Sequence, residues 1–153
     1  IDNKKIKIEN SVKNLLIKEE EFGITKIETY LKFQDEVNKV KKKIQEFFIN
    51  ARKKGKKIVC YGAAAKGNTV LNFCEITKDS IDYVVDISPH KQGKFLPGTH
   101  IPIYSPEKIK DTKPDYIVIL AWNLKDEIIE QMNFVKEWEG QFVVLVPEVK
   151  ILE

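Results

Sequence analysis

Cysteine and long apolar runs are both scarce in this chain of 153 residues. The two cysteines, Cys60 and Cys74, form no Cys-x-x-Cys pair and have no spacing that suits a metal ion. They predict two buried, reduced thiols in a cytoplasmic protein rather than a disulfide framework or a structural metal site. Because every apolar run is short, the sequence predicts no transmembrane helix, and no signal peptide precedes the first motifs.

Methionine is scarcer still. Met132 is the only methionine, and the chain begins with Ile1. A native chain would start with methionine, so we expect these residues to be cut from a longer protein whose other domains are partners of this one. Proteolytic maturation is the alternative explanation of the same observation.

A strong charge of one sign is also missing. The net charge is +3, and 42% of the residues are apolar, which predicts a globular protein of one domain or of one domain with an appendage. Basic residues cluster at 41–43 and 52–57, but acidic residues are interleaved through the same helix and no exposed aromatic residues accompany them. This pattern favours a solvated helix face over a nucleic-acid-binding patch.

Two helices are predicted at the N-terminus. The first is capped by Asn10 or Ser11 and ends at Gly23, and the second runs from a capping box at Thr25 to Gly55. Apolar residues recur along the second helix at alternating steps of three and four: Tyr30, Phe33, Val37, Val40, Ile44, Phe47 and Ala51. A long coiled coil is one interpretation. Because the run is short, we favour a helix that packs on the first helix and then leads into a sheet.

From residue 57 onward, apolar strands alternate with helical segments. The strands are predicted at 57–61, 82–86, 101–103, 115–121 and 142–146. This alternation predicts an α/β domain over residues 56–153 with a five-stranded parallel sheet of order 3-2-1-4-5, preceded by a helical lead-in over residues 1–55. A serine and a proline at 105–106 start a short helix, and Asn123 is expected to cap a helix that runs to about Trp138.

A glycine-rich turn follows the first strand, with the sequence Tyr-Gly-Ala-Ala-Ala-Lys-Gly-Asn-Thr at 61–69. It is not a P-loop, because Asn68 stands where that motif has lysine, and it is not a dinucleotide fingerprint, because Ala64 stands at the second glycine. It can still accept an anion on the free N–H groups of the next helix, with Lys66 and Thr69 as further donors. A tight packing turn without a ligand is the alternative.

Polar residues follow the other strands as well. Asp86, Asn123 and Glu148 come after the second, fourth and fifth strands, so all are expected at the edge where open parallel sheets bind ligands. The aperiodic segment 87–100 is long enough to be functional or disordered, and its two histidines are expected at the surface rather than on a metal. The sequence offers no nucleophile motif and no carboxylate dyad, so no catalytic residue and no metal ligand is assigned.

Taken together, the motifs resemble the C-terminal domain of S-adenosylmethionine-dependent sugar C-methyltransferases, bacterial enzymes that act on nucleotide-linked deoxysugars. The resemblance rests on residues 61–69, 84–86 with Pro89, 91–93, 96–99, 101–103, 122–128 and 147–149, with similar residues at 11–12 and 19–21. It extends from about residue 10 to the end of the chain. It implies a three-layer, Rossmann-like domain. It also implies that the whole protein has a zinc-binding N-terminal domain and a central methyl-donor domain, to which the catalytic base belongs.

The function implied for this chain is therefore to bind the nucleotide-linked sugar beside the catalytic domain. No cofactor is expected in this part, whereas S-adenosylmethionine and zinc are implied for the full-length protein. The expected substrate-binding residues are Gly62, Ala63, Ala64, Lys66, Gly67, Asn68, Thr69, Asp86, Trp122 and Asn123. The alternatives are a self-sufficient nucleotide- or cofactor-binding regulatory domain and a purely structural scaffold.

Overall fold

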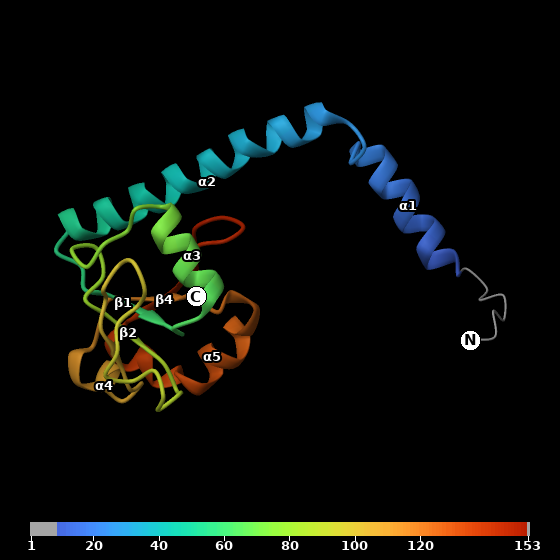
Figure 1. Cartoon of the computed structure of the whole chain (residues 1–153). Helices are drawn as coiled ribbons and strands as arrows, with labels where there is room; N and C mark the ends of the chain where they lie inside the picture. Colours follow the sequence, from blue (N-terminus) through green and yellow to red (C-terminus); the bar gives the residue numbers. More distant parts are fainter. Residues whose placement is uncertain (1–8, 153) are drawn as a thin grey trace. The chain divides into compact units, whose positions relative to one another are not determined.

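The computed structural model describes residues 9–152, and the chain divides between Asn38 and Lys39 into two compact units. The division lies inside the long helix α2 (Ile27–Lys53). Two helices precede the sheet, as the sequence predicts (Figure 1).

Helix α1 (Asn10–Phe22) ends where the sequence predicts but begins differently. The N–H of Gly23, in a left-handed conformation at φ 80°, donates to the carbonyls of Glu19 and Glu20. Glu9 occupies the N-cap position, so the prediction that Asn10 or Ser11 caps the helix is wrong. The helix buries none of its residues, and the predicted packing of the two helices against each other through the face of α1 is therefore not found. The exposed apolar residues of that face are Val12, Leu15, Leu16 and Phe22.

The C-terminal half of α2 packs on the sheet. Ile44, Phe48 and Ala51 are at most 5% exposed and belong to the core of the larger unit. Phe48 lies outside the predicted seam. By contrast, Tyr30 and Phe33 are 57% and 67% exposed, so the apolar seam is buried only where it meets the sheet. Burial against strands, rather than a coiled coil, explains this half of the pattern.

The sheet has six strands in the order β3-β2-β1-β4-β5-β6. The strands are β1 (Ile58–Tyr61), β2 (Tyr83–Val85), β3 (Ile103–Tyr104), β4 (Tyr116–Ile119), β5 (Gln141–Val144) and β6 (Lys150–Leu152). The first five are parallel and follow the predicted order 3-2-1-4-5. The sixth pairs antiparallel with β5 and was not predicted. In β1, Cys60 lies opposite Val84 on one side and Val118 on the other.

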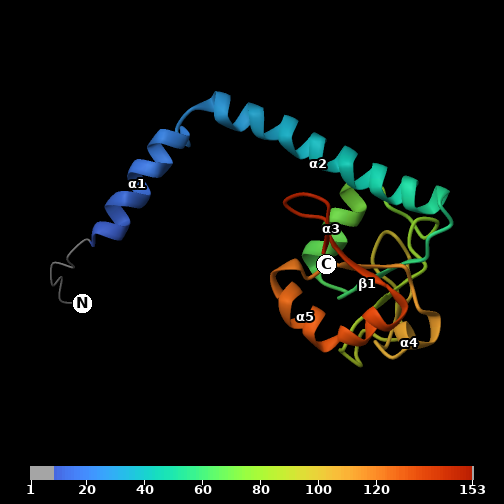
Figure 2. The ribbon, with the colours of Figure 1, turned by 180° about the vertical axis from the view of Figure 1, so that it is seen from behind.

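Helices cover both faces of this sheet, which makes three layers (Figure 2). One face carries the C-terminal half of α2 and the helix α3 (Ala65–Phe73), over Ile58 and Cys60. The other carries α4 (Lys108–Thr112), α5 (Lys125–Gln131) and the 3₁₀ helix η2 (Asn133–Trp138), over Val59 and Tyr61. Because successive residues of β1 face opposite layers and both layers are covered, the strand is apolar throughout.

The segment after β4 departs from prediction. A single helix capped by Asn123 is wrong, because Asn123 lies inside a short 3₁₀ helix, η1 (Trp122–Leu124), and Leu124 occupies the N-cap position of α5. A second break between α5 and η2 follows at Met132. This early 3₁₀ turn keeps residues 122 and 123 at the end of β4, close to the glycine-rich turn.

The aperiodic segment 87–100 is folded rather than disordered. Its backbone bonds to β3 and to the segment just before it. The N–H of Gly93 donates to the carbonyl of Ile103, and the N–H of Leu96, a residue only 2% exposed, donates to the carbonyl of Ile101. His90 and His100 are exposed, as predicted. No helix among residues 9–152 is long and apolar enough to cross a membrane.

Candidate functional site at the carboxyl edge of the sheet

The site lies at the carboxyl ends of β1, β2 and β4. From β1 the chain proceeds to β2 and β3 on one side, whereas β4 and β5 lie on the other side of β1. The loops after β1 and β4 therefore diverge and leave a crevice between them, which is where open parallel sheets bind ligands. All ten predicted site residues lie in the segments that directly follow β1, β2 and β4 at this edge, some of them in the first turns of α3 and in a 3₁₀ helix.

The glycine-rich turn is closed by its own backbone. Gly62 has a φ of 91°, a conformation that favours glycine, and the N–H of Ala64 returns to the Gly62 carbonyl over 2.8 Å. Helix α3 begins at Ala65, and the N–H of Asn68 donates to the Ala64 carbonyl. The N–H groups of the helix residues before Asn68 have no partner within the helix, so the turn presents donors at the helix start.

Gly67 has a packing role of its own. It is buried, and a methyl group added to its Cα would lie 2.5 Å from Cβ of Leu120 and 3.2 Å from the Leu120 carbonyl oxygen. Glycine is therefore required here for α3 to approach the end of β4, whether or not a ligand binds. This contact brings the start of α3 against the loop that carries Trp122.

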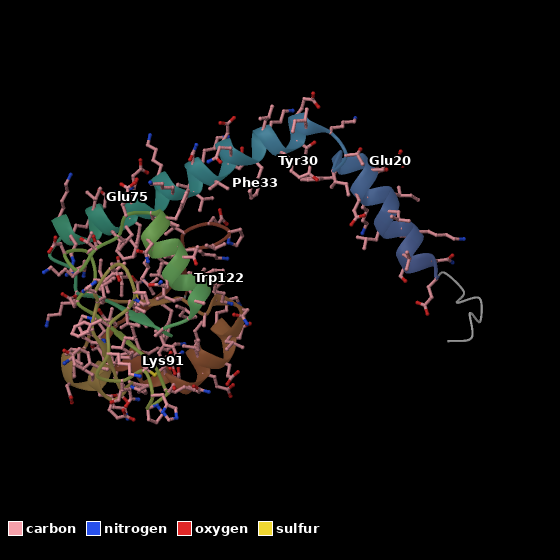
Figure 3. All side chains as sticks on the ribbon, viewed as in Figure 1. Glu20, Tyr30, Phe33, Glu75, Lys91 and Trp122 are labelled. Atoms are coloured by element: carbon pink, nitrogen blue, oxygen red, sulfur yellow. The ribbon has the colours of Figure 1, made fainter. Side chains whose placement is uncertain are left out.

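Lys66 joins the two loops of the crevice. Its ammonium group donates a hydrogen bond to Oδ1 of Asn123, and its Nζ lies 4.7 Å from the centre of the Trp122 ring. The three predicted residues come from two different loops, and the structure brings them into direct contact. Trp122, labelled in Figure 3, lies near the N-terminal end of α3. The cluster presents one positive charge, one amide and one aromatic ring.

Asp86 is tied to the glycine-rich turn by its own hydrogen bonds. It is only 6% exposed, and its carboxylate accepts hydrogen bonds from the N–H groups of Ala63 and Ser88, both at 2.8 Å, and from the Lys91 ammonium at 2.9 Å. Burial alone would raise the pKa of Asp86. The bonds from Lys91, Ser88 and Ala63 outweigh it and hold the pKa below its ordinary value. These hydrogen bonds hold the glycine-rich turn against the end of β2.

The two remaining predicted residues lie along α3. Thr69 is exposed, and its hydroxyl donates to the Ala65 carbonyl one turn earlier, over 3.1 Å. Asn68 is partly buried, and its side-chain oxygen is enclosed without a hydrogen-bond partner among residues 9–152. A buried amide oxygen without a partner is rare in proteins, so Asn68 is a candidate acceptor for a ligand donor.

The structure also shows a pocket of about 340 Å³ on the other side of the glycine-rich turn, which the sequence interpretation missed. Besides Gly62, Ala64 and Asp86, it is lined by Tyr61, Ile87, Ser88, Lys91, Ala121, Leu124, Glu127, Ile128 and Gln131. The residues 124, 127, 128 and 131 follow helical spacing directly after the fourth strand. That spacing was a signal in the sequence that this helix turns one face toward the same edge.

The described residues of this edge include no cluster of metal ligands, and the charge of Lys66 bears on any cationic ligand. Among residues 9–152, no group of three His, Cys, Asp or Glu side chains lies close enough together to hold a metal ion. The charge that faces the crevice from α3 is the ammonium of Lys66, which would repel the sulfonium of a methyl donor.

The fold defines a Rossmann-like α/β domain, and the crevice is its candidate ligand site. The chain belongs to the family described as the C-methyltransferase C-terminal domain, whose model matches residues 2–147. It is 36% identical over 142 residues to the C-methyltransferase NovU of Streptomyces niveus, covering 93% of this chain and 34% of that protein. The chain thus spans about a third of the relative's length. The crystal structure of UDP-D-quinovosamine 4-dehydrogenase from Vibrio fischeri is also similar, with a TM-score of 0.47 and 17% identity over 64% of this chain and 93% of that one.

Proposed function

We propose that this chain is the domain of a sugar C-methyltransferase that binds the nucleotide-linked sugar. The methyl-donor site and the catalytic base would lie in other domains of the same longer protein. There S-adenosylmethionine would supply the methyl group, and zinc would occupy a separate N-terminal domain. The proposal assigns binding and orientation to the present residues and no chemical step.

The observation that carries the proposal is the meeting of Lys66, Trp122 and Asn123. A lysine ammonium is a mobile point charge that suits a phosphate, and an asparagine amide both donates to and accepts from sugar hydroxyls. The free N–H groups at the start of α3 would add donors for the same phosphate. A positive edge of this kind favours a nucleotide-linked sugar, which is anionic, over the cationic sulfonium of the methyl donor.

Steady-state kinetics on Lys66→Ala in the intact methyltransferase tests the proposal. Loss of one charge-assisted contact costs about 1.5–3 kcal/mol, so we expect the KM for the sugar nucleotide to rise roughly ten- to a hundredfold. The KM for S-adenosylmethionine should stay unchanged. A matched control is Lys110→Ala, because Lys110 also lies over an aromatic ring, 4.6 Å from the centre of Phe134, on another part of the domain.

The competing role of Lys66 is purely structural. In that case its contacts with Trp122 and Asn123 only hold α3 to the loop after β4, and Lys66→Ala lowers the Tm without changing either KM. That outcome would reassign the chain to a scaffold. A rise in both KM values would instead place Lys66 at a hinge or at the methyl-donor site.

A further inference from the structure

We propose that the pocket between the glycine-rich turn, the segment after β2 and α5 holds the nucleoside part of the nucleotide-linked sugar, with the Tyr61 hydroxyl as one of its hydrogen-bonding groups. This inference rests on the proposed function, because the phosphates must continue from the pocket toward Lys66. It assigns a second subsite, separate from the cluster of Lys66, Trp122 and Asn123.

Size and lining suit a flat ring that carries a sugar. The volume of about 340 Å³ is within the range of small-molecule sites. Ile87, Ala121, Leu124 and Ile128 supply apolar walls, and Leu124 and Ile87 remain 48% and 68% exposed without a ligand. A nucleobase that stacks between these side chains would remove apolar surface from water, which is favourable.

Tyr61 is the strongest single indication of a ligand. It is the last residue of β1, only 5% of its surface is exposed, and it lines the pocket. Its hydroxyl has no hydrogen-bond partner among residues 9–152. Burial, and then the nearby carboxylates of Asp86 and Glu127, raise the pKa of Tyr61, so the phenol keeps its proton and remains a donor. A hydroxyl at the lining of a pocket, with no partner from the protein, is available to donate to a ligand acceptor.

Acceptors for hydroxyl groups lie at the rim. Glu127 accepts a bond from Gln131 over 3.1 Å, and its carboxylate has further capacity to accept. Asp86 keeps lone pairs beyond its bonds to Ala63, Ser88 and Lys91. Ribose hydroxyls fit such carboxylates. The ammonium of Lys91, which pairs with Asp86, also lines the pocket, so its charge is mixed. Gly62 and Ala64 of the turn line it as well, so phosphates that continue from the pocket toward Lys66 pass over the turn.

A nucleoside reaches an enzyme of this class from two sources, the sugar nucleotide and the adenosine part of S-adenosylmethionine. The position of Lys66 across the turn favours the first source, because only the sugar nucleotide carries phosphates there. The experiment is isothermal titration calorimetry of the chain with five probes: a nucleotide-linked deoxysugar, thymidine 5′-diphosphate, uridine 5′-diphosphate, free thymidine and S-adenosylmethionine.

Two variants test the pocket. Tyr61→Phe removes only the unpartnered hydroxyl, so we expect an unchanged Tm and a loss of about three- to tenfold in affinity for the nucleoside diphosphate that binds. Leu124→Trp fills the pocket from α5 and should abolish that binding. Tyr104→Phe, at a tyrosine outside the pocket, and Ile49→Trp, at an exposed position of α2, are the matched controls and should change neither affinity.

The outcomes separate this inference from the proposed function. If a nucleoside diphosphate binds and Lys66→Ala weakens it while both pocket variants leave it unchanged, the pocket assignment is overturned and the proposed function stands. If neither nucleoside diphosphates nor the sugar nucleotide bind, both fail. If S-adenosylmethionine binds and Tyr61→Phe weakens that binding, the pocket belongs to the methyl donor and the assignment to the sugar nucleotide is wrong.

Discussion

The carboxylate of Asp86 accepts a hydrogen bond from the backbone N–H of Ala63 over 2.8 Å, which joins the end of β2 to the glycine-rich turn after β1. An acid at this place in a dinucleotide-binding fold normally faces the ribose. Here the same oxygen of Asp86 also accepts from Lys91. The shape of the turn thus depends on a side chain that the sequence suggested as a ligand contact only.

Replacing Asp86 with asparagine should destabilise the domain. The amide keeps one acceptor but directs an NH₂ group at the donors of Ala63 or Ser88 and removes the partner of Lys91. A buried donor left unpaired costs about 1–3 kcal/mol, so we expect the free energy of unfolding to fall by about that amount in urea denaturation. Asp79→Asn, at an exposed aspartate, is the control. Equal stability of both variants would show that the Asp86 contacts contribute nothing.

The same network predicts how stability depends on pH. The pKa of Asp86 is lower in the folded protein than its ordinary value, so its stabilising contribution is complete above that ordinary value, about pH 4, and is lost as the pH falls through the folded pKa. Acid denaturation of the wild type should therefore steepen below about pH 4. In Asp86→Asn the slope should be shallower but not zero, because Asp115 also has a lowered pKa through bonds from Lys56 and Lys57 that outweigh its burial. The same dependence of unfolding free energy on pH in the wild type and in Asp86→Asn would contradict this contribution of Asp86.

Gly67→Ala should destabilise the domain although alanine is the better helix former. An added methyl would lie 2.5 Å from Cβ of Leu120, so α3 and β4 must separate. Such overpacking costs about 1–3 kcal/mol, against a propensity gain of about 1 kcal/mol. Thermal denaturation measures the difference, with Asn50→Ala on the exposed side of α2 as the control that should not lose stability. A rise in Tm for Gly67→Ala would mean that the contact relaxes freely.

Most of the fold was predictable from the sequence because local patterns and burial agree. The five parallel strands and their order follow from apolar runs such as 115–121, which are typical of strands covered on both faces. The last strand, β6, was missed because Lys150 and Ile151 are exposed at the sheet edge and leave no apolar run. The unburied face of α1 was also mispredicted, since amphipathic spacing does not show whether a partner surface exists within the chain.

The site was only partly predictable, for a similar reason. Strand order places Lys66 and Asn123 at one edge, and the structure confirms that they meet. The sequence does not show which polar groups satisfy one another, so the bonds of Asp86 to the turn were not foreseen. Nor does it show that Tyr61, the last residue of an apolar strand, keeps an unpartnered hydroxyl in a pocket.

The segment 87–100 should depend on Asn72 of α3 for its position. The side-chain amide of Asn72 donates to the carbonyls of Pro97 and Asn68, and Gly98 packs so closely that a methyl group there would overlap the Asn72 side chain. Asn72→Ala should cost about 0.5–1.5 kcal/mol and speed amide hydrogen exchange in 93–100. Exchange in β1 and β4 is the internal control. Unchanged exchange in 93–100 would show that the backbone bonds near Leu96 suffice.

The central claim is that this chain binds the nucleotide-linked sugar and not the methyl donor. Calorimetric titration of the chain with a nucleotide-linked deoxysugar, and separately with S-adenosylmethionine, tests it most directly. The account predicts saturable binding of the sugar nucleotide that Lys66→Ala weakens about ten- to a hundredfold, with negligible heat from S-adenosylmethionine. Micromolar binding of S-adenosylmethionine, with no binding of the sugar nucleotide, would contradict it.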